Sequence, residues 1–154
     1  MAGEGNLEDL YREVILEHYK SPRNRGRLEG PGTQQVELQN PTCGDEIQLS
    51  LLIQDGRVAD ARFSGRGCSI SMASASMMTE LMKGKTLEMA LQLSRDFKAM
   101  VAGGPAPESL GDLVALSGVA QFPVRVKCAT LGWNALLRAL DHADADVDGQ
   151  PPPS

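Results

Sequence analysis

The sequence predicts a single α+β domain in which a three-stranded antiparallel sheet packs against several helices. Apolar residues alternate with polar ones in the first half of the chain, and an Asp55-Gly56 pair separates two such runs. Helical spacing of apolar residues follows in the second half. With 154 residues and 42% hydrophobic content, the chain is long enough for one core and short for two. We place this domain at residues 1–140.

A first helix is predicted from Leu7 to Tyr19, where apolar residues recur at intervals of three and four and Asn6 can cap the start. Pro22 disfavours helical geometry in the residue before it, so the helix should end there and an exposed basic loop should follow. We expect His18 on the surface or edge of this helix, and not as a metal ligand.

Three strands are predicted next, at 35–39, 47–54 and 57–63. The Asp-Gly pair between the second and third is a strong signal for a tight hairpin.

Four helices are predicted after the sheet. One begins after Cys68, and a second begins at Thr86, whose side chain can cap it. A short helix is expected from Leu110 to Leu116, and a final one from near Cys128 to Leu140. Residues 141–154 are rich in aspartate and end in prolines, so we expect a disordered tail.

Composition narrows the class of protein. The net charge of −5 argues against nucleic acid as a partner. The chain has no apolar run of about 18 residues and no signal-peptide pattern at its start, so we expect a cytoplasmic protein without a membrane partner. Three cysteines in a reducing compartment favour metal binding or thiol chemistry over a disulfide framework.

The cysteines are the main clue to function. Cys43, Cys68 and Cys128 each lie at a predicted element boundary, at intervals too long for a zinc knuckle, so the tertiary fold would have to assemble any site. Asp45, two residues after the first cysteine, can complete a set of four tetrahedral zinc ligands. The alternatives are cysteines that serve as small buried hydrophobes and an aspartate that closes a turn.

Such a site has a surplus of negative charge and a candidate nucleophile. Three thiolates and a carboxylate around a doubly positive ion leave an excess of two negative charges, which Arg125 or Lys127 could partly offset. Thiolates attack sulfur–sulfur bonds, the step common to disulfide exchange and persulfide transfer. Cys43, in a predicted turn, is the candidate for that attack.

Several ordered motifs resemble a known family. The segments are 10–24 (LYREVILEHYKSPRN), 40–45 (NPTCGD), 65–71 (GRGCSIS) and 127–133 (KCATLGW). They are similar to iron–sulfur cluster assembly proteins of the IscU/NifU N-terminal superfamily, which have a SufE/NifU-like fold, and the match covers roughly Leu7 to Leu140. Within it, the chain is most similar to the SufU branch of zinc-dependent sulfur acceptors.

The resemblance implies zinc on Cys43, Asp45, Cys68 and Cys128, with Cys43 accepting persulfide sulfur. The donor would be a SufS-type cysteine desulfurase. The sulfur would pass on to a SufBCD-type assembly complex or to apo-protein acceptors. Arg125 would be a second functional residue, and the desulfurase interface is where we expect it. The protein would act as a sulfurtransferase-like carrier.

Three departures separate the chain from the scaffold members. Those carry a histidine where Lys127 stands, and a Leu-Pro-Pro-Val-Lys motif where residues 121–125 read QFPVR. The interval from Cys68 to Cys128 is also longer here, with the excess near 102–120. The alternative is a scaffold that assembles a [2Fe–2S] cluster, or holds iron, on the same four ligands. A purely structural zinc is the third possibility.

Overall fold

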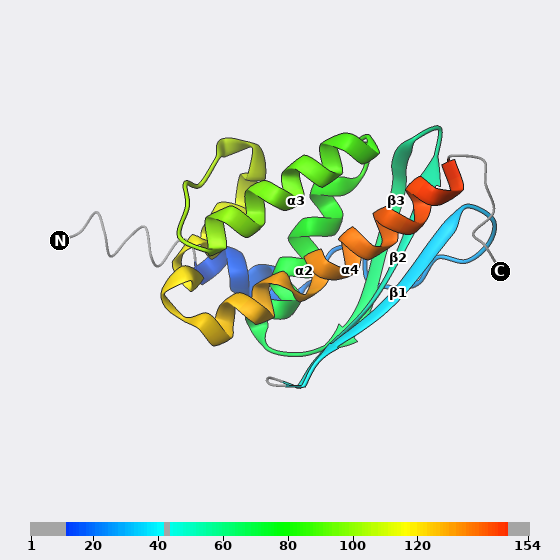
Figure 1. The fold of residues 1–154 in the computed structure, drawn as a ribbon. Helices are drawn as coiled ribbons and strands as arrows, with labels where there is room; N and C mark the ends of the chain where they lie inside the picture. Colours follow the sequence, from blue (N-terminus) through cyan, green and yellow to red (C-terminus); the bar gives the residue numbers. More distant parts are fainter. Residues whose placement is uncertain (1–11, 42–43, 148–154) are drawn as a thin grey trace.

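The computed structural model describes residues 12–41 and 44–147 (Figure 1). A helix spans 12–20, and the remaining elements are β1 (Thr33–Asn40), β2 (Asp45–Gln54), β3 (Arg57–Arg66), α2 (Ser69–Met82), α3 (Leu87–Val101), the 3₁₀-helix η1 (Glu108–Gln121) and α4 (Pro123–Val147). The parts of the first helix predicted at Asn6 to Tyr11, and the tail residues 148–154, lie outside the described residues.

The sheet has the predicted topology. Its order is β1-β2-β3, both pairs are antiparallel, and Val36, Leu49 and Phe63 lie opposite one another. The β2–β3 turn has Asp55 at φ 54° and Gly56 at φ 72°. A two-residue type I′ hairpin turn needs a positive φ at both of its central residues, and the Asp-Gly pair adopts these angles with little strain.

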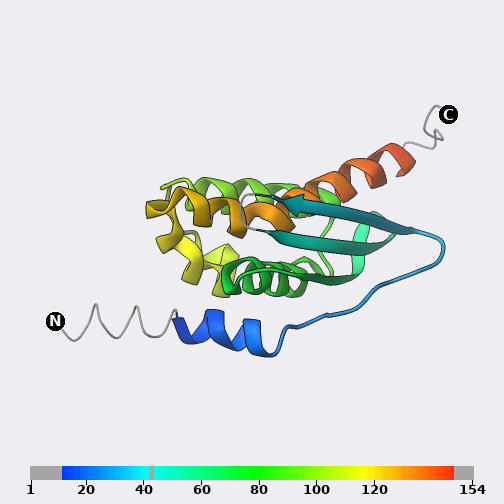
Figure 2. The same ribbon diagram turned by 90° about the horizontal axis from the view of Figure 1, so that it is seen from below.

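One face of the sheet forms the core. The buried side chains on this face alternate along the strands: Val36, Ile47, Leu49, Leu51, Ala61 and Phe63. Helices α2 and α4 lie against it, and α3 packs against α4, with Phe97 stacked on Trp133 at a centroid distance of 4.5 Å. Figure 2 shows the chain after the first helix running along the sheet before it enters β1.

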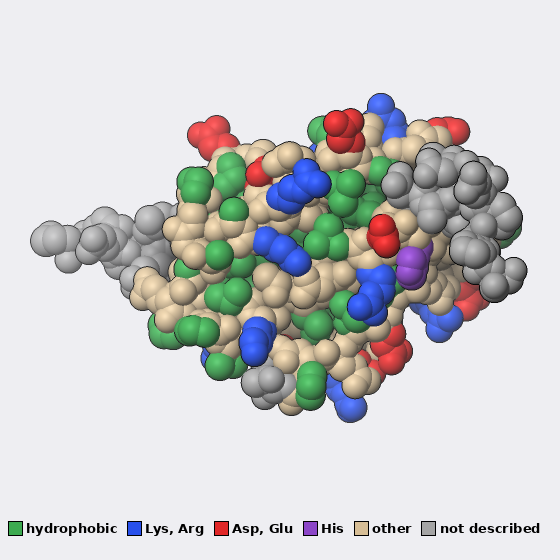
Figure 3. Space-filling model, viewed as in Figure 1, with side chains coloured by type: hydrophobic (Ala, Val, Ile, Leu, Met, Phe, Trp, Pro, Cys, Tyr) green, Lys and Arg blue, Asp and Glu red, His purple; other side chains and the backbone are tan. Residues whose placement is uncertain are grey.

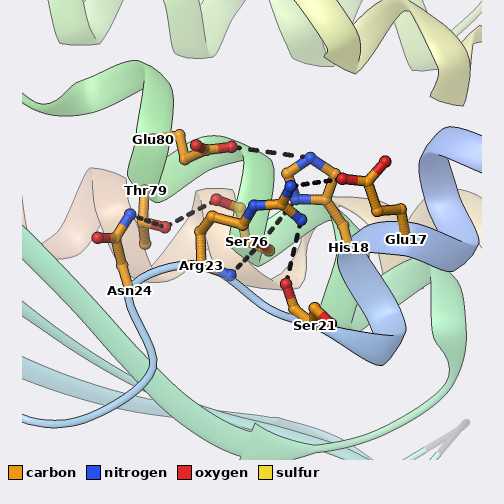
Figure 4. Close-up of polar contacts among 8 residues, drawn as sticks. All are labelled: Glu17, His18, Ser21, Arg23, Asn24, Ser76, Thr79 and Glu80. Atoms are coloured by element: carbon orange, nitrogen blue, oxygen red, sulfur yellow. Dashed lines mark hydrogen bonds and ion pairs between the residues drawn. The ribbon is translucent and has the colours of Figure 1, made fainter.

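The first helix is joined to α2 by a polar network (Figure 4). His18 Nδ1 is hydrogen-bonded to Ser76 Oγ at 2.7 Å, and the backbone N–H of Arg23 donates to the same oxygen at 2.8 Å. Nε2 of His18 lies 3.7 Å from Glu80 Oε1. The expectation of a surface histidine is therefore wrong: the residue is 3% exposed, because the helix turns it toward α2. Burial, and then the charge of Arg23, lower the pKa of His18 below its ordinary 6.5.

The segment after α3 differs from the predicted short α-helix. It is a 3₁₀-helix over Glu108–Gln121 that is interrupted at Gly111, where φ is 57°. Leu110, Leu113, Leu116 and Val119 are buried along it. Leu113, Leu116 and Val119 follow the interruption, and because a 3₁₀-helix has three residues per turn, their spacing of three places them on one side. The segment packs against α2, α3 and α4.

Helix α4 is longer than predicted at both ends. It begins at Pro123 rather than near Cys128, because proline has a backbone angle suited to the first helical position. It also continues to Val147, so the first seven residues of the predicted tail are helical. None of the described helices combines the length and apolar character needed to cross a bilayer.

Candidate metal centre

The fold brings three of the four predicted ligands together. One ligand atom each from Asp45, Cys68 and Cys128 lies within 4.8 Å of the other two. Asp45 is the first residue of β2, Cys68 is the N-cap of α2, and Cys128 is in the second turn of α4. The fourth predicted ligand, Cys43, lies outside the described residues, two positions before Asp45 in the chain.

Strand pairing sets the position of the carboxylate. Asn40 and Asp45 are the last paired residues of the β1–β2 hairpin, and the N–H of Gly44 donates to the Asn40 carbonyl at 2.8 Å. Asp45 shares the core face with Ile47, which leaves it only 2% exposed. The sheet therefore points a buried carboxylate toward the ends of α2 and α4.

Asp45 and Cys68 are joined by a hydrogen bond that requires a close approach of the chain. The N–H of Cys68 donates to Asp45 Oδ1 at 3.0 Å. Gly67 makes this possible, since a Cβ there would lie 2.5 Å from the same oxygen. The glycine before the second cysteine thus admits the carboxylate.

The Cys68 sulfur caps α2. The N–H of Ser71 donates to Cys68 Sγ at 3.5 Å, in the position where serine or aspartate commonly accepts. A helix N-terminus carries partial positive charge and free N–H groups, and the Cys68 sulfur lies at that end of α2.

Contacts between α2 and α4 hold Cys128. It is 2% exposed, and the Ser74 hydroxyl donates at 2.7 Å to the carbonyl of Ala129, the next residue. Trp133 Nε1 in turn donates to Ser74 Oγ at 3.1 Å. These two buried hydrogen bonds fix the position of α4 relative to α2 next to the candidate metal centre.

The donor set and its geometry fit a zinc ion. Zinc bonds of about 2.0–2.3 Å at tetrahedral angles separate ligand atoms by about 3.3–3.8 Å. Cys68 Sγ and Asp45 Oδ2 are 3.9 Å apart, and the three-atom group needs to contract by about an ångström to reach that range. No basic side chain of the described residues forms an ion pair with Asp45, and a buried carboxylate is costly without a cation.

The predicted basic residues lie at the surface next to the centre. Lys127 and Arg125 are both exposed on α4, and the described structure does not place either among the ligands. Arg125, with Arg12, helps to line an apolar groove of about 510 Å³ that reaches Ser69 and Ile70, the residues after Cys68.

That groove and one buried serine were not anticipated from the sequence. Hydrophobic side chains gather where η1 ends and α4 begins (Figure 3), and Phe122 and Val124 there are 58% and 55% exposed. Large exposed apolar residues of this kind mark interaction surfaces. The serine is Ser71, which is 0% exposed. Its position three residues after Cys68 was the only feature of the sequence that could have drawn attention to it.

Comparison with known proteins agrees with the fold. The family model of the NifU-like N terminal domain matches residues 10–142. The chain therefore belongs to the NifU-like N-terminal domain family, as a SufU-type member of the IscU/NifU superfamily.

Two relatives and one solved structure illustrate the match. The zinc-dependent sulfurtransferase SufU of Bacillus subtilis (strain 168) is 52% identical, over 91% of this chain and 95% of the relative. The iron–sulfur cluster assembly scaffold protein IscU of Streptococcus pyogenes serotype M1 is 46% identical, over 89% and 86%. A crystal structure of a candidate scaffold protein for the SUF system from Fervidobacterium islandicum AW-1 has a TM-score of 0.78 and 34% identity, over 83% and 94%.

Proposed function

We propose that this chain is a zinc-dependent iron–sulfur cluster assembly protein that accepts persulfide sulfur from a SufS-type cysteine desulfurase. The observation that carries the proposal is the convergence of Asp45, Cys68 and Cys128 within 4.8 Å, with Cys43 two residues away in the chain. The 52% identity to a zinc-dependent sulfurtransferase supports it. The cytoplasm is the compartment in which we propose that it acts.

The four side chains have distinct tasks. Asp45, Cys68 and Cys128, completed by Cys43, would hold the zinc ion, which when bound keeps its cysteines as thiolates. Cys68 is restrained by the α2 N-terminus and Cys128 by burial. Cys43 is therefore the cysteine that we assign to the reaction.

The transfer itself is a thiolate exchange. The Cys43 thiolate attacks the terminal sulfur of the desulfurase persulfide, and a new sulfur–sulfur bond forms on Cys43. The sulfur–sulfur bond on the desulfurase breaks, and its electron pair leaves with that enzyme's cysteine as a thiolate. No net oxidation occurs, and the persulfide on Cys43 then passes to a SufBCD-type complex or to apo-protein acceptors.

Arg125 is the second residue of the proposed function. It lines the apolar groove that borders Ser69 and Ile70, so a partner that covers the groove also approaches the metal centre. We assign Arg125 to contact with the desulfurase, because a mixed apolar and cationic surface suits a partner that presents apolar and acidic side chains.

The test is the activity of the desulfurase with each variant. Cys43→Ser should abolish the stimulation of alanine production from cysteine, and the wild-type chain should gain the mass of one sulfur atom on Cys43. Full stimulation by Cys43→Ser would refute the acceptor role. A far-ultraviolet spectrum like that of the wild type controls for folding.

A cluster scaffold is the second candidate, favoured by the names of the Streptococcus pyogenes and Fervidobacterium islandicum relatives. Its ligands would be the same four residues. Anaerobic reconstitution separates the two functions: a stoichiometric [2Fe–2S] cluster that moves to an apo-acceptor would favour the scaffold, and failure to retain one would favour sulfur transfer.

A further inference from the structure

A hydroxyl group is buried beside the metal centre without a hydrogen-bond partner in the described part of the chain. It belongs to Ser71, which is 0% exposed. Buried hydroxyl groups are normally paired, and an unpaired one calls for an explanation. The backbone N–H of the same residue already donates to a ligand atom, Cys68 Sγ.

The relative direction of α2 and α4 shows what this residue faces. Cys68 meets Cys128 at the centre, Ser74 bonds to Ala129, and Ala75 lies against Gly132. In these pairs the residue numbers increase in the same direction along α2 and α4, so the two helices run parallel. Ser71 lies between Cys68 and Ser74, one turn before the latter and on nearly the same face. It is therefore level with the stretch of α4 that carries Cys128.

The negative charge of the metal centre favours an additional hydrogen-bond donor near the ligands. Three thiolates and a carboxylate around a divalent cation leave an excess of two negative charges, and Asp45 and Cys128 are each only 2% exposed. Two described N–H groups point at the ligand atoms: that of Cys68 toward Asp45, and that of Ser71 toward Cys68. A further donor from α2 to the α4 side of the centre would offset more of this charge.

We propose that the Ser71 hydroxyl donates a hydrogen bond to the Cys128 thiolate when the centre holds its metal. Ser71 is then a positioning residue, which orients a ligand and tunes its charge rather than binding the metal itself. The inference rests on the metal-binding part of the proposed function and not on sulfur transfer. The hydroxyl can rotate to meet the sulfur as the ligand atoms contract.

The test compares Ser71→Ala with Ser76→Ala, which removes a second buried hydroxyl from the same helix. Zinc affinity is measured by competition with a chelator, and the sulfur-to-metal charge-transfer bands are recorded with cobalt(II). Ser71→Ala should bind zinc about tenfold more weakly and shift the cobalt bands, because a thiolate loses its donor. Its resistance to denaturant without metal should not fall, since that hydroxyl has no described bond to lose.

Ser76→Ala should behave in the opposite way. It loses its bonds to His18 and to the backbone of Arg23, so it should unfold at lower denaturant concentration while its zinc affinity and cobalt spectrum stay at the wild-type values. Wild-type affinity and an unchanged spectrum in Ser71→Ala would overturn the inference. Equal changes in both variants would also overturn it, because a general loosening of α2 would then explain them. Neither measurement involves the desulfurase, so failure of sulfur transfer is detected separately.

Discussion

The backbone N–H of Cys68 donates a 3.0 Å hydrogen bond to Asp45 Oδ1, and this contact ties the start of α2 to the start of β2. The two residues are 23 positions apart, and both are predicted ligands. A carboxylate that accepts this bond is oriented before any metal arrives, so the centre is partly preorganised.

The charge and the hydrogen bond of Asp45 can be separated by two substitutions. Asp45→Asn keeps an oxygen near the Cys68 N–H but loses the anion, so we expect zinc affinity to fall at least about tenfold with little change in folding. Asp45→Ala also leaves a buried donor unpaired, which should cost about 1–3 kcal/mol of the free energy of unfolding without metal. Chelator competition and denaturant unfolding measure the two effects. Wild-type zinc affinity in Asp45→Asn would remove this residue from the ligand set.

Gly67 should be intolerant of a side chain for a reason specific to the centre. Gly67→Ala places a methyl group 2.5 Å from Asp45 Oδ1, so the carboxylate must shift and zinc affinity should fall by about tenfold or more. Gly118→Ala is the matched control, since a Cβ there meets nothing within 4 Å. Equal zinc affinities in the two variants would show that the close approach at Gly67 is unimportant for binding.

Arg125 is expected to act on partner binding rather than on the metal. Arg125→Ala should raise the concentration needed for half-maximal stimulation of the desulfurase several-fold, because a charged contact at the groove is lost, and should leave zinc affinity unchanged. Arg138→Ala removes another exposed arginine from α4 and should have no effect on stimulation. Equal stimulation curves for the two variants would argue against the assignment of Arg125.

His18 should make the fold less stable in mild acid. Because its pKa is lowered by burial and by Arg23, the unfolded chain takes up a proton more readily than the folded one. Its stabilisation is complete above about pH 6.5 and is lost as the pH falls toward the folded pKa. The nearby carboxylates Glu17, Glu80 and Asp112 act against this shift but do not reverse it.

The measurement is denaturant unfolding between about pH 7.5 and 5.5 with the same metal bound throughout. The free energy of unfolding of the wild type should fall relative to that of His18→Gln as the pH falls, since glutamine does not titrate. His142→Gln changes an exposed histidine and should follow the wild type. A pH-independent difference between wild type and His18→Gln would contradict the prediction.

The sequence alone determined the local elements and supplied the candidate ligands. Asp55-Gly56 specified its hairpin, Thr86 capped α3, with the Met89 N–H donating to its hydroxyl at 3.1 Å, and alternation along the strands selected the core face. These signals depend on neighbours in the chain, so periodicity and capping chemistry reveal them. The spacing of three in η1 was also present, but it is easily taken for an α-helical pattern.

Only the tertiary structure decided which distant groups meet. The burial of His18 against Ser76, the parallel run of α2 and α4, and the approach of Asp45, Cys68 and Cys128 each depend on packing between segments far apart in the chain. No local pattern encodes such contacts, because they follow from burying the apolar faces of several elements together. The sequence could name candidate ligands, but the hydroxyl of Ser71 and the groove beside Arg125 became visible only with the helices in place.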